Sequence, residues 1–381
     1  MAETTLVYTP RFAEYDFGPG HPMRPLRVQR TYELIRACGL LERPHVSLVA
    51  PSMVDEETLA LVHHRKYIGA VRTPRQGEYA HRALDFGLGT IDNPIVEGMY
   101  EASAIVVGGS VSAADGVIDG AASVAFNPSG GLHHARRARA AGFCIFNDAA
   151  VAIAHLLKRC GKDVKVAYVD IDAHHGDGVQ EAFYRQRNVL TISLHESGRY
   201  LYPGSGYVEE IGEGKGTGFS VNLPLAPYTT DDTYLFAFRE VVCPLLEAYA
   251  PDFVFTQLGI DTHYRDPLTH MCLTTRGYAA VVDEIAQRAG RWIALGGGGY
   301  EMTVVPRAWT LAFARMTESD PPEEIPPSEA AHYPGGGEGV KLHDSNDAGV
   351  SADLSAAARE FAEKTVQSVK QFVFQYHGLP T

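Results

Sequence analysis

The sequence has few cysteines, and their placement argues against two kinds of site. The 381 residues include five cysteines, an odd number, and no two of them form a C-x-x-C pair. A disulfide-stapled secreted fold and a zinc site built from thiolates both need grouped cysteines, so neither is expected. Scattered free thiols fit a reducing compartment, and a cytoplasmic location is therefore predicted.

Positive charge and long apolar runs are also scarce. The chain has 33 Lys and Arg against 46 Asp and Glu, a formal net charge of −13. A protein that neutralises phosphates needs a basic surface, and the one basic run, at residues 136–139, is short, so direct nucleic-acid binding is not expected. No apolar run of about 18 residues occurs, and the first twenty residues lack a long apolar core. We therefore expect a chain that neither spans a membrane nor is exported.

Short β-rich runs alternate with helical segments along the chain. The composition, 45% hydrophobic and 21% charged, is that of a globular protein. Alternating β and α segments predict an α/β fold, a doubly wound and mostly parallel sheet flanked by helices. The predicted strands are residues 123–127, 164–171, 189–194, 253–260 and 292–295.

Two helices are predicted between these strands. Residues 146–160 have helical periodicity, with Asn147 or Asp148 as the N-cap. Residues 231–250 have it too, with an interruption at Pro244.

The remainder of the chain predicts a single domain over residues 1–381. Residues 318–345 are too rich in Pro and Gly for a packed element and are expected to form a loop. Residues 351–377 are expected to form a C-terminal helix, whose apolar face docks onto the body of the protein.

The residues that follow four of the predicted strands carry unusual chemistry. In doubly wound sheets the ligand lies beyond the carboxyl ends of the strands, so these residues are expected to converge. They are His133 and His134 after the first predicted strand, Asp172, His174 and Asp177 after the second, Asp261 after the fourth, and Tyr300, preceded by four glycines, after the fifth.

Three of these residues are candidate metal ligands. Asp172 and His174 are two residues apart, so in an extended chain their side chains leave from one face, and Asp261 at another strand end supplies a third ligand. Two carboxylates and one imidazole leave positions open for water and substrate, as a catalytic Zn²⁺ site requires. Because the set contains no thiolate, Fe²⁺ is an alternative.

The other residues are candidates for acid–base chemistry. A metal whose charge two aspartates neutralise acidifies water weakly, so separate proton-transfer groups are needed, and His133 and His134 can supply them. Asp170 and Asp177 are placed to orient these imidazoles. Tyr300 can donate a hydrogen bond to a developing oxyanion.

Two other histidines and the glycine run have simpler interpretations. His63 and His64 lie in a stretch expected to be helical, residues 56–70, and are interpreted as structural. The glycine run at 296–299 could form a phosphate-binding loop, but no G-K-[ST] follows it and no G-x-G-x-x-G opens a first βα unit. Nucleotide binding by this run is therefore not expected.

Together the motifs resemble those of the zinc-dependent deacetylases related to class I histone deacetylases, within the arginase-deacetylase superfamily. Two passages, HESGRYLYPGSG at 195–206 and PRAWT at 306–310, are most similar to the bacterial acetoin-utilisation branch, whose members act as lysine deacetylases. The motifs occur in family order: HPMRP at 21–25, GTIDNP at 89–94, GGLHHA at 130–135, GFCIFND at 142–148, YVDIDAHHGDGV at 168–179, PGSG at 203–206, QLGIDTHYRDP at 257–267 and GGGGY at 296–300.

The resemblance implies a role for each matching residue. It implies Asp172, His174 and Asp261 as metal ligands, His134 as general base and acid backed by Asp177, His133 as its electrostatic companion backed by Asp170, and Tyr300 as the oxyanion donor. It also implies that Gly142, Phe143, Tyr202 and Leu268 line an acyl-lysine tunnel, that Asp92 is a rim carboxylate for the substrate backbone, that Arg27 lies near the acetate exit, and that Asp170, Asp172, His174, Ser193 and Leu194 bind K⁺.

The substrate is left open between two classes. An acetylated lysine of a protein or peptide is favoured, and an acetylpolyamine or another small acetylated amine is the alternative. Tyr202 stands where many relatives have Phe, so the preferred acyl length stays open. A silent acyl-lysine reader is disfavoured because no ligand or catalytic residue is missing. A two-metal ureohydrolase is disfavoured, because such an enzyme needs a D-x-D motif after its last ligand strand. Here Thr262 and His263 follow Asp261 instead.

Overall fold

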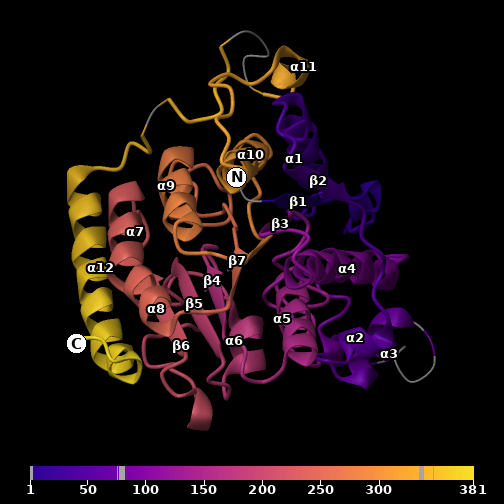
Figure 1. Ribbon diagram of the computed structural model, residues 1–381, viewed down its shortest axis with the longest axis horizontal. Helices are drawn as coiled ribbons and strands as arrows, with labels where there is room; N and C mark the ends of the chain where they lie inside the picture. The colour runs from indigo at the N-terminus through magenta and orange to yellow at the C-terminus, as the bar shows by residue number, and fades with distance from the viewer. Residues whose placement is uncertain (1–2, 75, 77–81, 334–338, 346) are drawn as a thin grey trace.

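A fully parallel eight-stranded sheet forms the centre of the part of the chain that the structure describes (Figure 1). This computed structural model describes residues 3–74, 76, 82–333, 339–345 and 347–381. The strand order is β2-β1-β3-β8-β7-β4-β5-β6, which confirms the predicted α/β class. The strands are β1 Thr4–Val7, β2 Val46–Val49, β3 Val124–Asn127, β4 Val166–Asp170, β5 Val189–Glu196, β6 Ser220–Leu225, β7 Phe253–Gln257 and β8 Trp292–Leu295.

Helices cover both faces of the sheet. On one face α4, α5 and α6 pack together, and on the other α1, α10, α9, α7 and α12 form a row of packed helices (Figure 1). The helices are α1 Leu26–Ala37, α2 Glu56–Leu59, α3 Arg65–Arg72, α4 Met99–Ile118, α5 Asp148–Cys160, α6 Asp177–Phe183, α7 Asp231–Ala237, α8 Cys243–Tyr249, α9 Thr275–Ala286, α10 Val305–Met316, α11 Pro327–Ala330 and α12 Ala352–Val373.

The five predicted strands are present; β3, β4 and β7 are shorter than predicted, β5 extends to Glu196, β8 matches, and three further strands were missed. All residues of the five are buried, since helices cover both faces of the sheet, and this burial explains their continuous apolar runs. The missed β2 is an edge strand with mostly exposed residues. The missed β6 is the other edge, where Pro224 is tolerated because one side of the strand needs no ladder hydrogen bond.

The predicted interruption of the helix next to Pro244 is present in the structure. A π-helical turn, Phe238–Val242, joins α7 to α8, and Pro244 lies in the first turn of α8. The backbone stays helical through this turn, because the Cys243 N–H donates to the carbonyl oxygen of Phe238, five residues earlier. The N-cap prediction for the earlier helix is confirmed, since the Asn147 side chain accepts the Ala150 N–H at 2.9 Å.

The continuous helix predicted over 56–70 is also wrong. The helix α2 ends at Leu59, and α3 begins at Arg65 with His64 as its N-cap. His63 lies in the turn between them, is buried, and accepts the backbone N–H of Asn147 at 3.0 Å. Both histidines therefore have structural roles, although not within one helix.

One helix, α4, is long and apolar enough by length and composition to cross a membrane. Glu101 and Asp115 interrupt its apolar sequence, and 72% of its apolar window is buried inside the protein. It packs against β1, β3 and β8 of the sheet and against α5.

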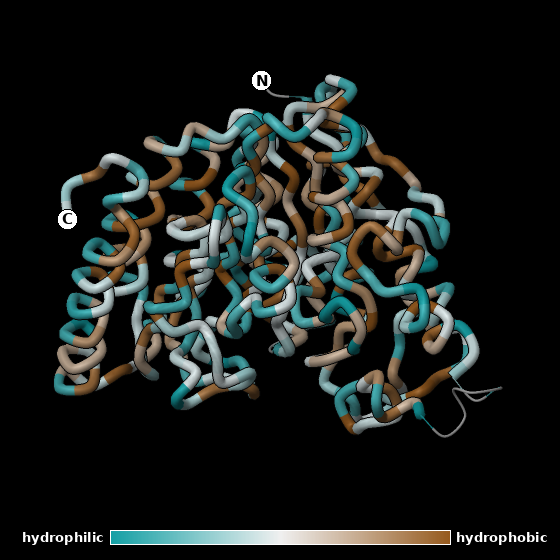
Figure 2. The backbone as a smooth tube through the Cα atoms, turned by 90° about the horizontal axis from the view of Figure 1, so that it is seen from below, coloured by the Kyte–Doolittle hydropathy of each residue, from teal (hydrophilic) through white to brown (hydrophobic). Residues whose placement is uncertain are grey.

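The C-terminal helix α12 packs against β6 and α7. Hydrophilic and hydrophobic residues alternate along it (Figure 2), and Ala362, Val366, Val369 and Val373 join the main hydrophobic core. In the Pro/Gly-rich region, α11 and a bridge between Glu324 and Lys341 surround a small second core, while residues 334–338 lie outside the described residues.

Candidate active site

The strands that carry the candidate residues are neighbours in the middle of the sheet. The order β3-β8-β7-β4-β5 and the parallel register place the carboxyl ends of five strands in one row. The loops that leave this row therefore meet above it. The row consists of the last residues of four strands, Asn127, Leu295, Gln257 and Asp170, together with Ser193, three residues before the end of β5.

The three candidate metal ligands form one buried cluster. Asp172, His174 and Asp261 place their ligand atoms within 4.8 Å of one another. His174 Nδ1 lies 3.1 Å from Asp172 Oδ1 and 2.9 Å from Asp261 Oδ2. The predicted set is thus brought together from two strand ends.

Neighbouring groups hold the two carboxylates in place. Asp172 Oδ2 accepts hydrogen bonds from the Gln257 side chain at 2.5 Å and from Gly298 N–H at 2.7 Å, and Asp261 Oδ1 accepts Ala173 N–H at 2.7 Å. A Cβ at Gly298 would lie 2.1 Å from Asp261 Oδ2, so glycine is required for this close approach.

The electrostatics of this cluster fit a cation. Burial and the charge of Asp172 raise the pKa of Asp261 to about 8. Burial opposes the ionisation of Asp172 as well, but the charges on His133 and His174 hold its pKa well below its usual range. Two adjacent buried carboxylates ionise together only when positive charge compensates them, and a divalent ion provides it. The cluster therefore fits the predicted metal.

Two carboxylates orient the adjacent histidine pair. His133 Nδ1 donates to Asp170 Oδ2 at 2.8 Å, and His134 Nδ1 donates to Asp177 Oδ1 at 2.7 Å, because an ionised carboxylate only accepts. Tyr168 also donates to Asp170 Oδ2, at 2.7 Å. The predicted pairing of each histidine with its aspartate is present in the structure.

The two histidines differ in protonation. Burial alone would lower the pKa of His133, but the charges of Asp170 and Asp172 raise it to about 9. Burial and the charge of His133 lower the pKa of His134 to about 4. The Nε2 atoms of the pair lie 3.0 Å apart, so a charged His133 lies beside a neutral His134. A neutral imidazole is the form that can take a proton from water.

Tyr300 remains a phenol and is oriented through its backbone. Burial, followed by the charges of Asp261 and Asp172, raises the pKa of its hydroxyl well above the usual range. Its N–H donates to Asp266 Oδ2 at 2.8 Å, and its ring meets that of Phe143 edge to face, with centroids 5.7 Å apart. Within the described residues the hydroxyl makes no hydrogen bond, so it is available to a ligand.

Aromatic rings and a glycine surround the approach to His134. The Tyr202 ring lies edge-on to His134, with centroids 5.1 Å apart, and to His174 at 6.5 Å. Gly142 and Phe143 have positive φ angles of 50° and 67°. Three of the predicted tunnel residues therefore lie beside the reactive groups.

The other predicted substrate residues lie around this centre. Asp92 is exposed, and its carbonyl oxygen lies 3.2 Å from His21 Nε2, whose ring contacts Phe143. Leu268 is partly buried, and its N–H donates to Asp266 Oδ1 at 2.9 Å. The other oxygen of this carboxylate accepts the N–H of Tyr300.

Arg27 lies on the inner side of the site. It is buried, donates to the carbonyl oxygen of Gly299 at 2.9 Å, and its guanidinium carbon lies 5.9 Å from the centroid of the Tyr300 ring. An arginine held here places positive charge behind the predicted oxyanion donor.

The residues implied for K⁺ lie on two adjacent strand ends. Ser193 of β5 pairs in register with Asp170 of β4, and the next residue, Leu194, has its carbonyl oxygen 3.5 Å from the Tyr234 hydroxyl. Asp172 and His174 come directly after Asp170 and the end of β4 in the chain. The five residues are thus close neighbours, and their binding of K⁺ stays a prediction.

Several supporting residues were missed by the sequence analysis. Asp148, noted only as a possible helix cap, accepts the N–H groups of Gly131 and Leu132 at 3.0 and 2.7 Å and so fixes the loop before the histidine pair. Gln257 and Asp266 lie within a quoted motif but were given no role. Gln257 could have been found as a polar residue at the end of a buried strand, whereas Asp148 and Asp266 follow no strand directly.

Replacing Gly142 with alanine is expected to lower kcat at least tenfold. A Cβ there would lie 2.4 Å from His134 Cδ2, so either the imidazole or the backbone must move. Steady-state kinetics on the folded variant measures this. Gly120→Ala is the control, because Gly120 also has a positive φ, 74°, but nothing within 4 Å. Equal kcat values for the two variants would contradict the steric argument.

Comparison with known proteins gives consistent matches. The profile of the histone deacetylase domain matches residues 21–316. The acetoin utilization protein AcuC of Bacillus subtilis is 43% identical over 334 residues, which cover 86% of this chain and 85% of that protein. AcuC of Staphylococcus xylosus is 37% identical, covering 84% and 85% of the two chains.

Solved structures agree with these matches. A crystal structure of an HDAC homologue complexed with SAHA superposes with a TM-score of 0.85 at 30% identity, covering 96% of this chain and 100% of that one. An HDAC homologue from Aquifex aeolicus gives a TM-score of 0.83 at 30% identity, with the same coverage.

Proposed function

This chain belongs to the histone deacetylase family, as its motifs indicated, and we propose that it is a metal-dependent hydrolase that removes acetyl groups from lysine side chains of proteins and releases acetate. The observation that carries the proposal is the buried cluster of Asp172, His174 and Asp261, with the paired histidines packed against it.

A single divalent ion, Zn²⁺ or in its place Fe²⁺, is proposed for this cluster. Bound there, it would act as a Lewis acid on the acetyl carbonyl and would acidify a water molecule. We also propose K⁺ for the neighbouring set that includes Asp170 and Ser193, where it would balance buried negative charge behind the site.

The protein's own residues supply the proton transfers. Neutral His134, held by Asp177, takes the proton from the attacking water and then protonates the departing lysine amine. Protonated His133, held by Asp170, contributes positive charge beside it. The Tyr300 hydroxyl donates a hydrogen bond to the oxyanion of the tetrahedral intermediate.

The surroundings of the site favour a lysine side chain presented by a peptide. Tyr202, Phe143 and Gly142 flank His134 and would line a narrow passage for an uncharged acyl-lysine stem, with Leu268 completing it. Exposed Asp92 would accept N–H groups of a peptide backbone at the rim. The net charge of −13 further favours basic peptides. Acetylpolyamines share this chemistry and are the alternative.

A direct comparison of substrates tests this choice. The zinc-loaded protein is assayed for product release from an acetyl-lysine peptide, a longer acyl-lysine peptide and N-acetylputrescine, each with and without a chelator. We expect the acetyl-lysine peptide to have the highest kcat/KM and the chelator to abolish its turnover. A preference for N-acetylputrescine of more than tenfold would overturn the protein-lysine assignment while leaving the deacetylase chemistry intact.

Metal removal is expected to lower thermal stability. Since the ion binds only the folded protein, free Zn²⁺ at about 100 times its Kd adds about 2.7 kcal/mol, and Tm should rise by a few degrees over the chelated protein. Differential scanning calorimetry measures this. Asp261→Asn should lose the rise, and Asp232→Asn, at an exposed position of α7, should keep it. The same Tm with and without Zn²⁺ would contradict the metal assignment.

Two further features are proposed along with the activity. We propose that residues 1–381 act as one catalytic domain, because the main core includes residues from β1 through α12. We also propose a cytoplasmic location, which is supported by the five free cysteines, none of them in the catalytic centre.

A further inference from the structure

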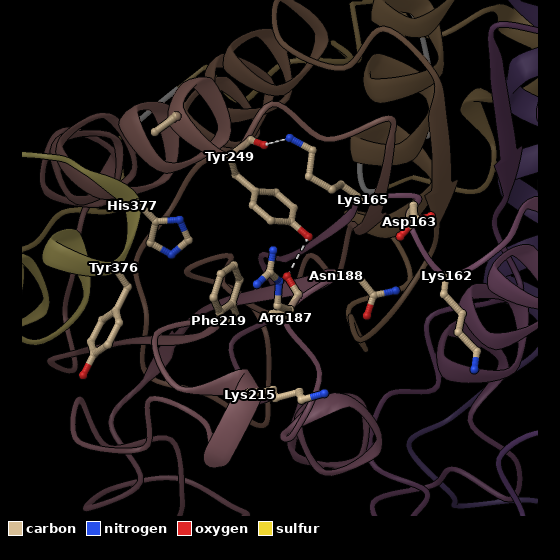
Figure 3. A pocket seen from close by; sticks show the side chains of 11 residues that line it. Lys162, Asp163, Lys165, Arg187, Asn188, Lys215, Phe219, Tyr249, Tyr376 and His377 are labelled. Carbon is tan, nitrogen blue, oxygen red and sulfur yellow. Dashed lines mark hydrogen bonds between the residues drawn. The ribbon is translucent and has the colours of Figure 1, made fainter.

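A pocket of about 790 Å³ lies at the amino-terminal end of the sheet (Figure 3). Lys165 and Asn188, in its wall, immediately precede β4 and β5, whose other ends carry Asp170 and Ser193 of the candidate active site. The pocket is therefore separated from that site by the length of the strands. Its lining residues are Lys162, Asp163, Lys165, Arg187, Asn188, Lys215, Phe219, Ala248, Tyr249, Tyr376 and His377.

The pocket concentrates positive charge in an acidic protein. Four cationic side chains line it and only one carboxylate, that of Asp163. Three of the eight lysines of the chain are among them. The net charge of the chain is −13, so positive charges spread evenly over the surface would not gather in one pocket in this way.

These cations are also largely unpaired. Among the described residues, no carboxylate lies within ion-pair distance of Lys162, Arg187 or Lys215. Arg185, two residues from Arg187, does form such a pair, with Glu213 at 2.8 Å. Unpaired cations in one concavity repel one another, and a bound anion would remove that cost.

The fourth cation is held in a defined position. Lys165 Nζ donates to the carbonyl oxygen of Tyr249 at 2.6 Å and lies 5.4 Å from the centroid of the Tyr249 ring (Figure 3). An ammonium group has three donors, so two remain for a ligand.

Aromatic rings that pack against one another form the second wall of the pocket. Phe219 lies edge-on to Tyr249 and to His377, with centroids 5.9 and 5.0 Å apart. The Tyr249 hydroxyl donates to the carbonyl oxygen of Arg187 at 3.2 Å (Figure 3), and His377 Nε2 donates to that of Gly218 at 2.7 Å. The wall is therefore preformed, and the neighbouring Tyr376 offers a further ring that is 46% exposed.

We propose that this pocket binds a small phosphorylated ligand that carries a planar ring, a nucleotide by chemical class. Lys162, Arg187 and Lys215 would contact the phosphates, and the ring would stack against the aromatic wall. The volume lies within the range of about 300–1,000 Å³ typical of small-molecule sites. This inference does not rest on the proposed deacetylase function, since the pocket shares no residue with that site.

A small ligand is favoured over a nucleic-acid strand. The cations face one concavity, and the phosphates of a strand would need basic residues along a continuous path. No phosphate-loop motif marks this pocket in the sequence, because its residues come from separate segments between positions 162 and 377.

Isothermal titration calorimetry at low salt tests the proposal, with ATP, tripolyphosphate, adenosine and a single-stranded oligonucleotide as probes. We expect saturable ATP binding with a Kd below about 1 mM. Tripolyphosphate should bind at least threefold more weakly and adenosine at least tenfold more weakly. The double variant Arg187→Glu/Lys215→Glu should weaken ATP binding at least tenfold.

The matched control is Arg43→Glu/Lys66→Glu, which makes the same charge change at two exposed residues outside the pocket. It should change the Kd for ATP by less than about twofold if the pocket, and not net charge, binds the ligand. Tyr376→Ala should weaken ATP binding and leave that of tripolyphosphate unchanged. Circular dichroism verifies that each variant is folded.

Four outcomes would overturn the proposal. They are no saturation by ATP at millimolar concentration, an equal loss of binding in the control variant, equal affinities for ATP and tripolyphosphate, and tighter binding of the oligonucleotide than of ATP with the same dependence on Arg187 and Lys215.

Discussion

Replacing His134 with alanine is expected to reduce kcat by about 10²–10⁴ while the protein still binds one metal ion. The imidazole is the group beside the metal cluster that is both neutral and oriented, since Nδ1 donates to Asp177 at 2.7 Å and the pKa is lowered to about 4. Without it, neither the attacking water nor the departing amine has a proton-transfer partner.

Turnover and metal content must be measured on the same preparation of this variant. His332→Ala, at an exposed position, is the matched control and should keep normal turnover. A metal-loaded His134→Ala enzyme with near-normal kcat would show that another group moves the proton.

Replacing Tyr300 with phenylalanine is expected to lower kcat by about 10²–10³ with little change in KM. The hydroxyl is a protonated donor, and it has no hydrogen-bond partner among the described residues, so its energetic contribution is made to a ligand. The hydrogen bond strengthens as charge develops on the oxygen, which is why kcat and not KM should respond.

Steady-state kinetics with the acetyl-lysine peptide separates the two parameters. Tyr228→Phe, which removes an exposed hydroxyl, is the control and should leave both unchanged. A Tyr300→Phe enzyme that differs from the wild type only in KM would contradict the oxyanion role and indicate a contact made equally in the ground state.

The sequence predicts the central part of the fold better than its edges. The strands β3, β4, β5, β7 and β8 are buried on both faces, so selection for packing leaves apolar runs that are visible without a structure. The edge strand β2 is mostly exposed, and β6 contains Pro224, so neither has that pattern. The π-helical turn before Pro244 depends on packing, which local propensity does not report.

The metal ligands of the candidate site could be predicted from the sequence, but the residues that orient them could not. Asp172, His174 and Asp261 are recognisable because they follow buried parallel strands, whose carboxyl ends lie at one edge of the sheet. The residues that orient them are not, because their contacts join distant positions: Gln257 meets Asp172 across 85 residues. Asp266, which holds the Tyr300 N–H, follows no predicted strand directly. Such contacts follow from the folded geometry, which spacing in the sequence does not contain.

Acetate release as a function of added zinc tests whether the protein is a metal-dependent deacetylase. The metal-free protein is titrated with Zn²⁺, and acetate released from an acetyl-lysine peptide is measured at each point. We expect the rate to rise linearly, to reach a plateau at one equivalent of Zn²⁺ per chain and to return to background after chelation. A rate in the chelated protein equal to that of the zinc-loaded protein would contradict this expectation.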